Sequence, residues 1–226
     1  MKAMILAAGK GERMRPLTLT TPKPLLPAGD KPLIVHHLER LKAAGFRQMV
    51  INHAWLGMQI EEELGNGGTF GVSIEYSREH QPLETAGGII QALPMLTSGG
   101  DEWFAVINGD IWCDLDLAQL TPPDGADALL VMTDNPPHNP AGDFYLGPTG
   151  RVAMDGPEML TFTGISLLHR RLFDGLAPGT MKLAPLLREA MARNRVRGLH
   201  HTGQWMDIGT PERLRELDRK LKGSES

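Results

Sequence analysis

Short apolar runs alternate with amphipathic helical patterns along the first half of the chain. The runs cover residues 3–6, 48–52, 72–76 and 103–107, and the first of them lacks a polar face, as buried strands do. Helical periodicity separates them at residues 32–44, 55–64 and 85–93. This alternation of strands and helices predicts a parallel sheet with helices on both faces.

The second half has a different pattern, in which short strands follow a proline-rich turn. Strands are predicted at residues 128–133, 144–146, 152–154, 164–168 and 196–200. Helices are predicted at residues 181–193 and 211–221, the latter with leucines along one side. No linker separates the halves, so we expect a single domain over residues 1–226, with a free tail at 223–226.

Composition limits the classes of function. The net charge is −4, which gives no general attraction to nucleic acid or to an anionic membrane. The single cysteine, Cys113, excludes an intrachain disulfide and is typical of a reducing compartment. No signal peptide is predicted, and no apolar run approaches the roughly 20 residues of a membrane span. We therefore expect a cytoplasmic protein without nucleic-acid or membrane partners.

The stretch at residues 3–27 combines a buried strand with small residues and fixed cations. Ala7, Ala8, Gly9 and Gly11 allow backbone N–H groups to approach an anion. The cations that follow are Lys10, Arg13, Arg15 and Lys23, and four prolines stiffen the chain around them. The pattern is neither a Walker A motif nor a dinucleotide-binding fingerprint. It predicts a triphosphate site made of loop backbone and basic side chains.

Two aspartates at strand ends suggest a metal site beside those phosphates. Asp110 closes a buried strand in Asn108-Gly109-Asp110, and Asp207 stands between apolar residues just before a helix. Magnesium is usually bound by one or two carboxylates together with substrate phosphates. By contrast, we expect Cys113 to serve packing, and we expect no metal at the His36-His37 or His200-His201 pairs.

With these motifs the sequence resembles the nucleotidyltransferases that join a nucleoside triphosphate to a sugar 1-phosphate. The likeness extends from residues 7–25 through Thr85-Ala86-Gly87-Gly88 and Asn108-Gly109-Asp110 to Trp205 and residues 207–211. It implies a Rossmann-like three-layer α/β fold with a mostly parallel central sheet and a small sugar-binding β elaboration. Residues 1–120 would form a nucleotide-binding half, and residues 121–226 a sugar-binding half.

The resemblance also implies roles for single residues. Ala7, Ala8 and Gly9 would contact the base and ribose, Gly11 and Arg15 the triphosphate, and Lys23 the reacting phosphates. Arg15 and Lys23 would be catalytic, and Asp110 and Asp207 would bind Mg²⁺. The remaining substrate-binding residues would be Gln81 and Gly87 at the base, Asn108, and Glu158 and Thr163 at the sugar.

Two positions depart from the family pattern. Many members have Glu-Lys-Pro before the sugar-pocket strand, whereas this chain has Pro157-Glu158-Met159 and lacks the lysine. Lys182 could supply that cation or be an ordinary surface lysine. Many members also have glycine where this chain has Glu84. Glu84 could reach a ribose or sugar hydroxyl, or interact only with a helix N-terminus.

Within the family, the chain most resembles compact bacterial members that transfer a uridylyl group from UTP to N-acetylmuramic acid 1-phosphate in cell-wall recycling. We expect that reaction from a monomer or small homo-oligomer, with preference over N-acetylglucosamine 1-phosphate. The loop at 135–143, with His138, Asn139 and Gly142, would face the lactyl group. Arg151 could help or be merely solvated. The alternatives are guanylyl transfer to mannose 1-phosphate, thymidylyl or uridylyl transfer to glucose 1-phosphate, and a non-catalytic sugar-nucleotide-binding regulator.

Overall fold

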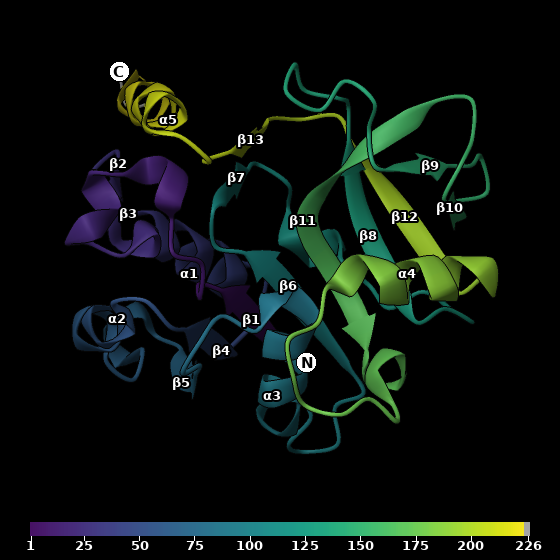
Figure 1. The fold of residues 1–226 in the computed structure, drawn as a ribbon, viewed down its shortest axis with the longest axis horizontal. Helices are drawn as coiled ribbons and strands as arrows, with labels where there is room; N and C mark the ends of the chain where they lie inside the picture. The colour runs from purple at the N-terminus through teal and green to yellow at the C-terminus, as the bar shows by residue number, and fades with distance from the viewer. Residues whose placement is uncertain (224–226) are drawn as a thin grey trace.

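The computed structural model describes residues 1–223, and residues 224–226 of the expected tail lie outside the described residues. A central sheet forms the middle layer of the molecule (Figure 1). Within residues 1–223 it has nine strands, in the order β10-β9-β11-β6-β1-β4-β5, with β8 pairing to both β11 and β12. The strands are β1 (Lys2–Leu6), β4 (Gln48–His53), β5 (Ser73–Arg78), β6 (Trp103–Asn108), β8 (Ala128–Thr133), β9 (Phe144–Leu146), β10 (Val152–Ala153), β11 (Met159–His169) and β12 (Val196–His201).

The sheet is parallel in the first half of the chain and mixed in the second. Strands β1, β4, β5 and β6 pair in parallel, as the alternation of strands and helices predicted. The long strand β11 then pairs antiparallel with both β6 and β8. The prediction of a mostly parallel sheet therefore holds for the first half only, because β11 returns in the opposite direction.

Helices cover both faces of the sheet and complete the three predicted layers. The helices are α1 (Leu33–Ala43), α2 (Gly57–Leu64), α3 (Glu84–Leu96), α4 (Leu183–Ala192) and α5 (Pro211–Gly223). Buried side chains of α1 and α2 pack with Ile5 and Ile51 on one face. Those of α3 and α4 pack with Met4 and Val106 on the other face. Alternate residues of each strand thus point into opposite cores, as the period of a strand requires.

A third core lies beside the sheet and joins the beginning of the chain to its last helix. It contains Met14, Leu26 and Leu33 together with Leu214 and Leu217 of α5. The segment between β1 and α1 holds the short 3₁₀ helices η1 (Glu12–Met14), η2 (Leu17–Leu19) and η3 (Lys23–Leu25), and the small ladder of β2 (Pro27–Ala28) with β3 (Lys31–Pro32). Packing in this core holds in place the segment that carries the predicted phosphate-binding residues.

Two features complete the description of the fold. The strands β7 (Ile111–Cys113) and β13 (Trp205–Asp207) form a separate antiparallel pair, and three further 3₁₀ helices are η4 (Gly68–Phe70), η5 (Leu117–Gln119) and η6 (Arg170–Phe173). No helix among residues 1–223 combines the length and the apolar character needed to cross a bilayer.

Candidate active site

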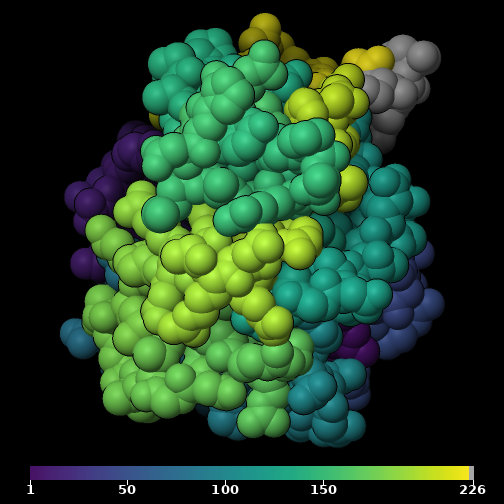
Figure 2. All heavy atoms as spheres, turned by 90° about the vertical axis from the view of Figure 1, so that its right-hand side faces the viewer, coloured from purple at the N-terminus to yellow at the C-terminus, as the bar shows by residue number. Residues whose placement is uncertain are grey.

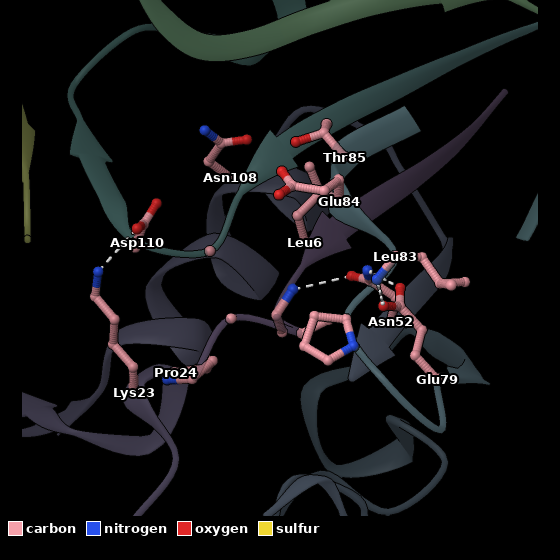
Figure 3. Close-up of a pocket in the computed structure, with 15 residues that line it drawn as sticks. Leu6, Lys23, Pro24, Asn52, Glu79, Leu83, Glu84, Thr85, Asn108 and Asp110 are labelled. Atoms are coloured by element: carbon pink, nitrogen blue, oxygen red, sulfur yellow. Dashed lines mark hydrogen bonds and ion pairs between the residues drawn. The ribbon is translucent and has the colours of Figure 1, made fainter. Parts of the chain in front are cut away.

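Three adjoining cavities lie along the carboxyl ends of β1 and β6. The strand-end cavity, of about 370 Å³, is lined by residues of both strand ends, including Ala7, Ala8 and Asn108 (Figure 3). The loop cavity, of about 660 Å³, shares Gly9 and Lys23 with it and extends along residues 9–14. The helix cavity, of about 460 Å³, shares Glu84, Thr85 and Asn108 with the strand-end cavity and extends toward α4. The shared lining residues place the three cavities next to one another, and we refer to them together as the cleft.

Lys23 lies between the strand-end and loop cavities with its charge directed at Asp110. Its side chain is only 10% exposed, and its Nζ lies 2.8 Å from Asp110 Oδ2 (Figure 3). Pro22 and Pro24 flank the lysine and restrict its backbone, which reduces the entropy lost when the ammonium is held in place. The predicted proximity of Lys23 and Asp110 is therefore present in the fold.

The β7–β13 ladder brings Asp207 to the same place. Asp207 is paired in register with Ile111, and the backbone N–H of Ile208 donates to the carbonyl of Asp110 at 2.8 Å. Asp207 Oδ2 lies 2.6 Å from Arg213 Nη1 and 3.6 Å from His138 Nε2. The His138 ring is stacked near Trp205, with 6.4 Å between ring centroids. Backbone pairing thus brings Asp207, which is distant in sequence, next to the Asp110–Ile111 backbone.

Asp110 and Asp207 offer oxygen donors of the kind that suits Mg²⁺, although Asp110 lines two of the cavities and Asp207 lines none of the three. One oxygen of each is held by a basic side chain, and within the described part of the chain the Oδ1 atoms of Asp110 and Asp207 accept no hydrogen bond. Hard divalent cations prefer such oxygen ligands. The chemistry of the residues present therefore fits the predicted metal, and the assignment itself stays a prediction.

A buried hydrogen-bond chain fixes the wall of the strand-end cavity. The N–H of Ala7 donates to Asn52 Oδ1, and Asn52 Nδ2 donates to Glu79 Oε1 at 2.6 Å. The other oxygen of Glu79 accepts the N–H of Leu83 at 3.0 Å (Figure 3). A Cβ on Gly88 would lie 2.6 Å from Glu79 Oε1, so only glycine leaves room for the carboxylate. Asn52 and Glu79 were not among the predicted site residues, although their polar side chains at the ends of the adjacent strands β4 and β5 were a usable signal.

The two arginines of the loop lie in different surroundings. Arg13 lines the loop cavity, and a Cβ on Gly209 would come within 3.2 Å of its Nη1. Arg15 does not line any of the three cavities, and its side chain is 56% exposed and 3.9 Å from Glu12. The catalytic role assigned to Arg15 stays a prediction that this geometry does not favour. Arg13 is better placed to meet a phosphate.

Most of the other predicted contact residues line the cleft. Those that do are Ala7, Ala8, Gly9, Gly11, Gln81, Glu84 and Asn108. Three do not line the cavities. Gly87 packs against the backbone of residues 179–181, Thr163 Oγ1 is buried and donates to the carbonyl of Val131, and Glu158 is exposed beyond β10. The sugar contacts predicted for Thr163 and Glu158 therefore gain no support from the structure.

Glu84 has an unusual backbone at the junction of two cavities. Its φ of 62° lies in the left-handed region, which a residue with a Cβ seldom occupies. The residue lines both the strand-end and helix cavities (Figure 3). Strained conformations of this kind persist where the surrounding structure enforces them, and they cluster at functional sites. This supports a substrate-facing role over a merely local interaction with the helix N-terminus.

His37 is buried near Asp110, with 4% of its surface exposed. Burial, with the nearby Arg40 as a second cause, lowers the pKa of His37 to about 4. A hydrogen bond to the backbone of Gly109 acts in the opposite direction. The imidazole is therefore neutral at physiological pH, and it supports the turn between Asn108 and Asp110 without adding charge to the cleft.

A separate cluster lies at the ends of β7 and β12. Ligand atoms of Cys113, Asp114 and His201 are within 4.8 Å of one another. His201 Nε2 is 2.8 Å from Asp114 Oδ1, whereas burial raises the pKa of the Cys113 thiol. A thiol held in its neutral form beside the Arg40 guanidinium is a poor metal ligand. The cluster thus has a structural explanation in the His201–Asp114 contact.

Comparison with known proteins agrees with this geometry. The family model described as "Nucleotidyl transferase" matches residues 2–144. The chain is 54% identical, over 96% of both chains, to an N-acetylmuramate alpha-1-phosphate uridylyltransferase of Neisseria meningitidis serogroup B. It is 31% identical to a mannose-1-phosphate guanylyltransferase of Mycobacterium tuberculosis, covering 93% of this chain and 61% of the relative.

Solved structures confirm the fold class. A Bacillus anthracis protein assigned as a glucose-1-phosphate thymidylyltransferase superposes with a TM-score of 0.83 at 22% identity, over 98% of this chain and 95% of that one. HddC from Yersinia pseudotuberculosis superposes with a TM-score of 0.77 at 20% identity, over 98% and 99%. The resemblance recognised in the sequence is therefore confirmed, and the chain belongs to the nucleotidyl transferase family.

Proposed function

We propose that the protein transfers a uridylyl group from UTP to N-acetylmuramic acid 1-phosphate and releases pyrophosphate. The observation that carries this proposal is the 54% identity, over nearly the whole chain, to the Neisseria uridylyltransferase. We further propose that the enzyme acts in the cytoplasm, as a monomer or small homo-oligomer.

The three cavities suggest where each part of the substrates binds. The strand-end cavity, within the size range of small-molecule sites, would hold the uridine against residues 6–9 and 79–85. The loop cavity, lined by Lys10 and Arg13, would hold the β- and γ-phosphates. The helix cavity would hold the sugar, and its phosphate would meet the α-phosphate near Lys23.

The chemistry is a displacement at phosphorus. A phosphate oxygen of the sugar 1-phosphate forms a bond to the α-phosphorus of UTP, and the bond from that phosphorus to the oxygen bridging to the β-phosphate breaks. Pyrophosphate leaves with the electron pair. Since the second pKa of such a phosphate is about 6, the attacking oxygen is already anionic near neutral pH, and no general base is needed. Catalysis then depends on positioning and on neutralising charge.

Different residues would contribute to positioning and to charge neutralisation. Lys23, held at a fixed place by its prolines, would neutralise charge on the reacting phosphates. Asp110 and Asp207 would hold Mg²⁺, which supplies further charge neutralisation when bound. The chain Ala7–Asn52–Glu79–Leu83 would keep the wall of the nucleotide pocket rigid, so that the α-phosphate stays in line with its attacker.

A pyrophosphate-release screen of four nucleoside triphosphates against a panel of sugar 1-phosphates tests the proposal. The expected result is highest turnover with UTP and N-acetylmuramic acid 1-phosphate. GTP with mannose 1-phosphate as the best pair, or a glucose 1-phosphate pair, would replace the substrate assignment. No turnover with any pair, alongside binding of UDP-sugars, would favour the non-catalytic regulator instead.

Substitutions test the residue assignments. Asp110→Asn and Asp207→Asn should each lower kcat by at least roughly a hundredfold with the fold intact. Lys23→Ala should depress kcat more than it raises the KM for UTP, because the charge it neutralises grows in the transition state. Asp155→Asn, an exposed acid that lines none of the three cavities, is the matched control and should leave turnover unchanged. Near-normal turnover in a folded Asp110→Asn protein would contradict the metal assignment.

A further inference from the structure

The helix cavity is lined by both acidic and basic side chains. Its acid at the junction with the strand-end cavity is Glu84, and its basic residues are Lys182, the N-cap of α4, and Arg188 within that helix. A second acid of the lining, Asp143, already accepts the N–H of Phe162 at 2.8 Å. No ion pair joins Glu84 to either basic residue in the described chain, although the backbone of Met181 hydrogen-bonds to Leu83 and Gly87 on either side of Glu84.

Helix geometry explains why Arg188 belongs to this wall. Leu183 and Leu187 are buried and line the cavity, and Ala184 and Arg188 lie one residue further along on the same face. Side chains four residues apart share one side of a helix. Helix α4 contacts β10, β12 and α3, and Figure 2 shows the second half of the chain covering the side of the molecule on which Figure 1 places α4. The cation is therefore placed by the packing of the two leucines.

Two neighbouring arginines form ion pairs with acidic side chains, whereas Arg188 forms none in the described chain. Arg193 at the end of α4 pairs with Glu189, and Arg195 pairs with Asp127 at 2.7 Å. Within residues 1–223, the side chains of Lys182 and Arg188 make no hydrogen bond or ion pair. Two unpaired cations lining one cavity favour an anionic ligand group, and the planar fork of arginine matches a carboxylate in particular.

We propose that Arg188, assisted by Lys182, binds the lactyl carboxylate of N-acetylmuramic acid 1-phosphate and so determines the preference for an acidic sugar. The inference rests on the proposed function, because it takes the helix cavity as the sugar site. N-acetylglucosamine 1-phosphate has the same ring, acetamido group and phosphate but lacks the carboxylate. A cation that binds only the carboxylate should therefore discriminate between these two substrates and leave their common parts untouched.

The test is kcat/KM for both sugar 1-phosphates, with UTP, in the wild type and in Arg188→Gln, Arg188→Lys and Lys182→Gln. In Arg188→Gln we expect kcat/KM for the muramic substrate to fall roughly tenfold to a hundredfold, mainly through KM, as for a lost charged hydrogen bond. The value for the glucosamine substrate should stay within about threefold, because it never makes that contact. Arg188→Lys should recover part of the loss, and Lys182→Gln should lower the preference by a smaller factor.

Arg193→Gln is the matched control, since it removes an arginine of the same helix that is paired outside the cavity. Its ratio of the two kcat/KM values should equal that of the wild type. An equal loss for both substrates in Arg188→Gln, or an unchanged ratio, would overturn the role of Arg188. A wild-type enzyme without preference for the muramic substrate would instead remove the proposed substrate, so the two failures are distinguishable.

Discussion

At the scale of single residues, Asn108 is held by the residue that faces it on β11. Asn108 ends β6 and lines both the strand-end and helix cavities. Gly164 lies against it with a φ of 82°, and a Cβ there would stand 2.5 Å from Asn108 Nδ2. A glycine at this position thus provides the backbone conformation and also the space for the amide.

We predict that Gly164→Ala lowers both stability and activity. A left-handed backbone costs a residue with a Cβ about 1–2 kcal/mol, and here the methyl group would also displace the Asn108 amide. Gly175→Ala is the control, since its φ is 77° but a Cβ there meets nothing within 4 Å. Urea denaturation should show a greater loss of unfolding free energy for Gly164→Ala, and kcat/KM should fall in that variant alone. Equal behaviour of the two variants would contradict a role for the Asn108 contact.

Some residues of the cleft could be predicted from sequence, and others could not. Lys23 and Asp110, which line the cavities, could be recognised from fixed prolines and a strand end, which are local signals. Asp207 was selected as a carboxylate among apolar neighbours, and its metal-binding role stays a prediction. The direction in which a loop side chain points depends on tertiary packing and cannot be predicted from neighbouring residues in the sequence. Arg13 and Arg15 are two residues apart, yet only Arg13 lines a cavity. The hydroxyl of Thr163 is likewise taken by a neighbouring strand, which no pattern within its own segment reveals.

At the scale of elements, α5 supports the loop that carries the cations. Leu214 and Leu217 of α5 share a core with Met14 of η1 and with Leu26, just beyond η3. Asp218 also accepts the backbone N–H of Gly29 at 2.9 Å. The helix therefore stabilises a segment far from it in sequence.

Leu217→Ala should destabilise the protein by about 2–5 kcal/mol, because Leu217 is fully buried and its loss leaves a cavity. The KM for UTP should rise as well, since Met14 loses a packing partner beneath the loop. Thermal unfolding with steady-state kinetics measures both effects. Leu19→Ala, at a position 54% exposed, should change stability by less than about 0.5 kcal/mol. A Leu217→Ala protein as stable as this control would disprove the supporting role.

The long helices and buried strands could be predicted because their periodicity is strong. The ladders β2–β3 and β7–β13 could not, because strands of two or three residues show no recognisable alternation. The hydrophobic pattern also could not predict that the sheet contains both parallel and antiparallel strands. Strand direction depends on how β11 returns between β6 and β8, and this is set by tertiary packing.

At the scale of the whole molecule, the two halves share one sheet. Strand β11 of the second half is paired with β6 of the first over five residues, from Ile165 with Ile107 to His169 with Trp103. Side chains of α3 and α4 belong to the same buried core. Separating the halves would expose both the strand edges and this core.

We therefore predict that the two halves unfold together, as the expected single domain requires. Differential scanning calorimetry should show one transition whose calorimetric enthalpy equals the van't Hoff enthalpy. Two resolved transitions, or a calorimetric enthalpy well above the van't Hoff value, would show instead that the nucleotide and sugar halves are independent folding units.

Two hydrogen bonds join the region of α2 to the segment between Arg15 and Lys23, and they make tryptophan fluorescence sensitive to the position of that segment. Trp55, just before α2, donates its indole N–H to the carbonyl of Thr18 at 3.0 Å and is 45% exposed. Gln59 of α2 donates to the carbonyl of Thr20, also at 3.0 Å. Indole emission depends on hydrogen bonding and on contact with water. A shift of the segment between Arg15 and Lys23 on nucleotide binding would change both, which makes Trp55 an intrinsic fluorophore for the segment that is proposed to bind the triphosphate.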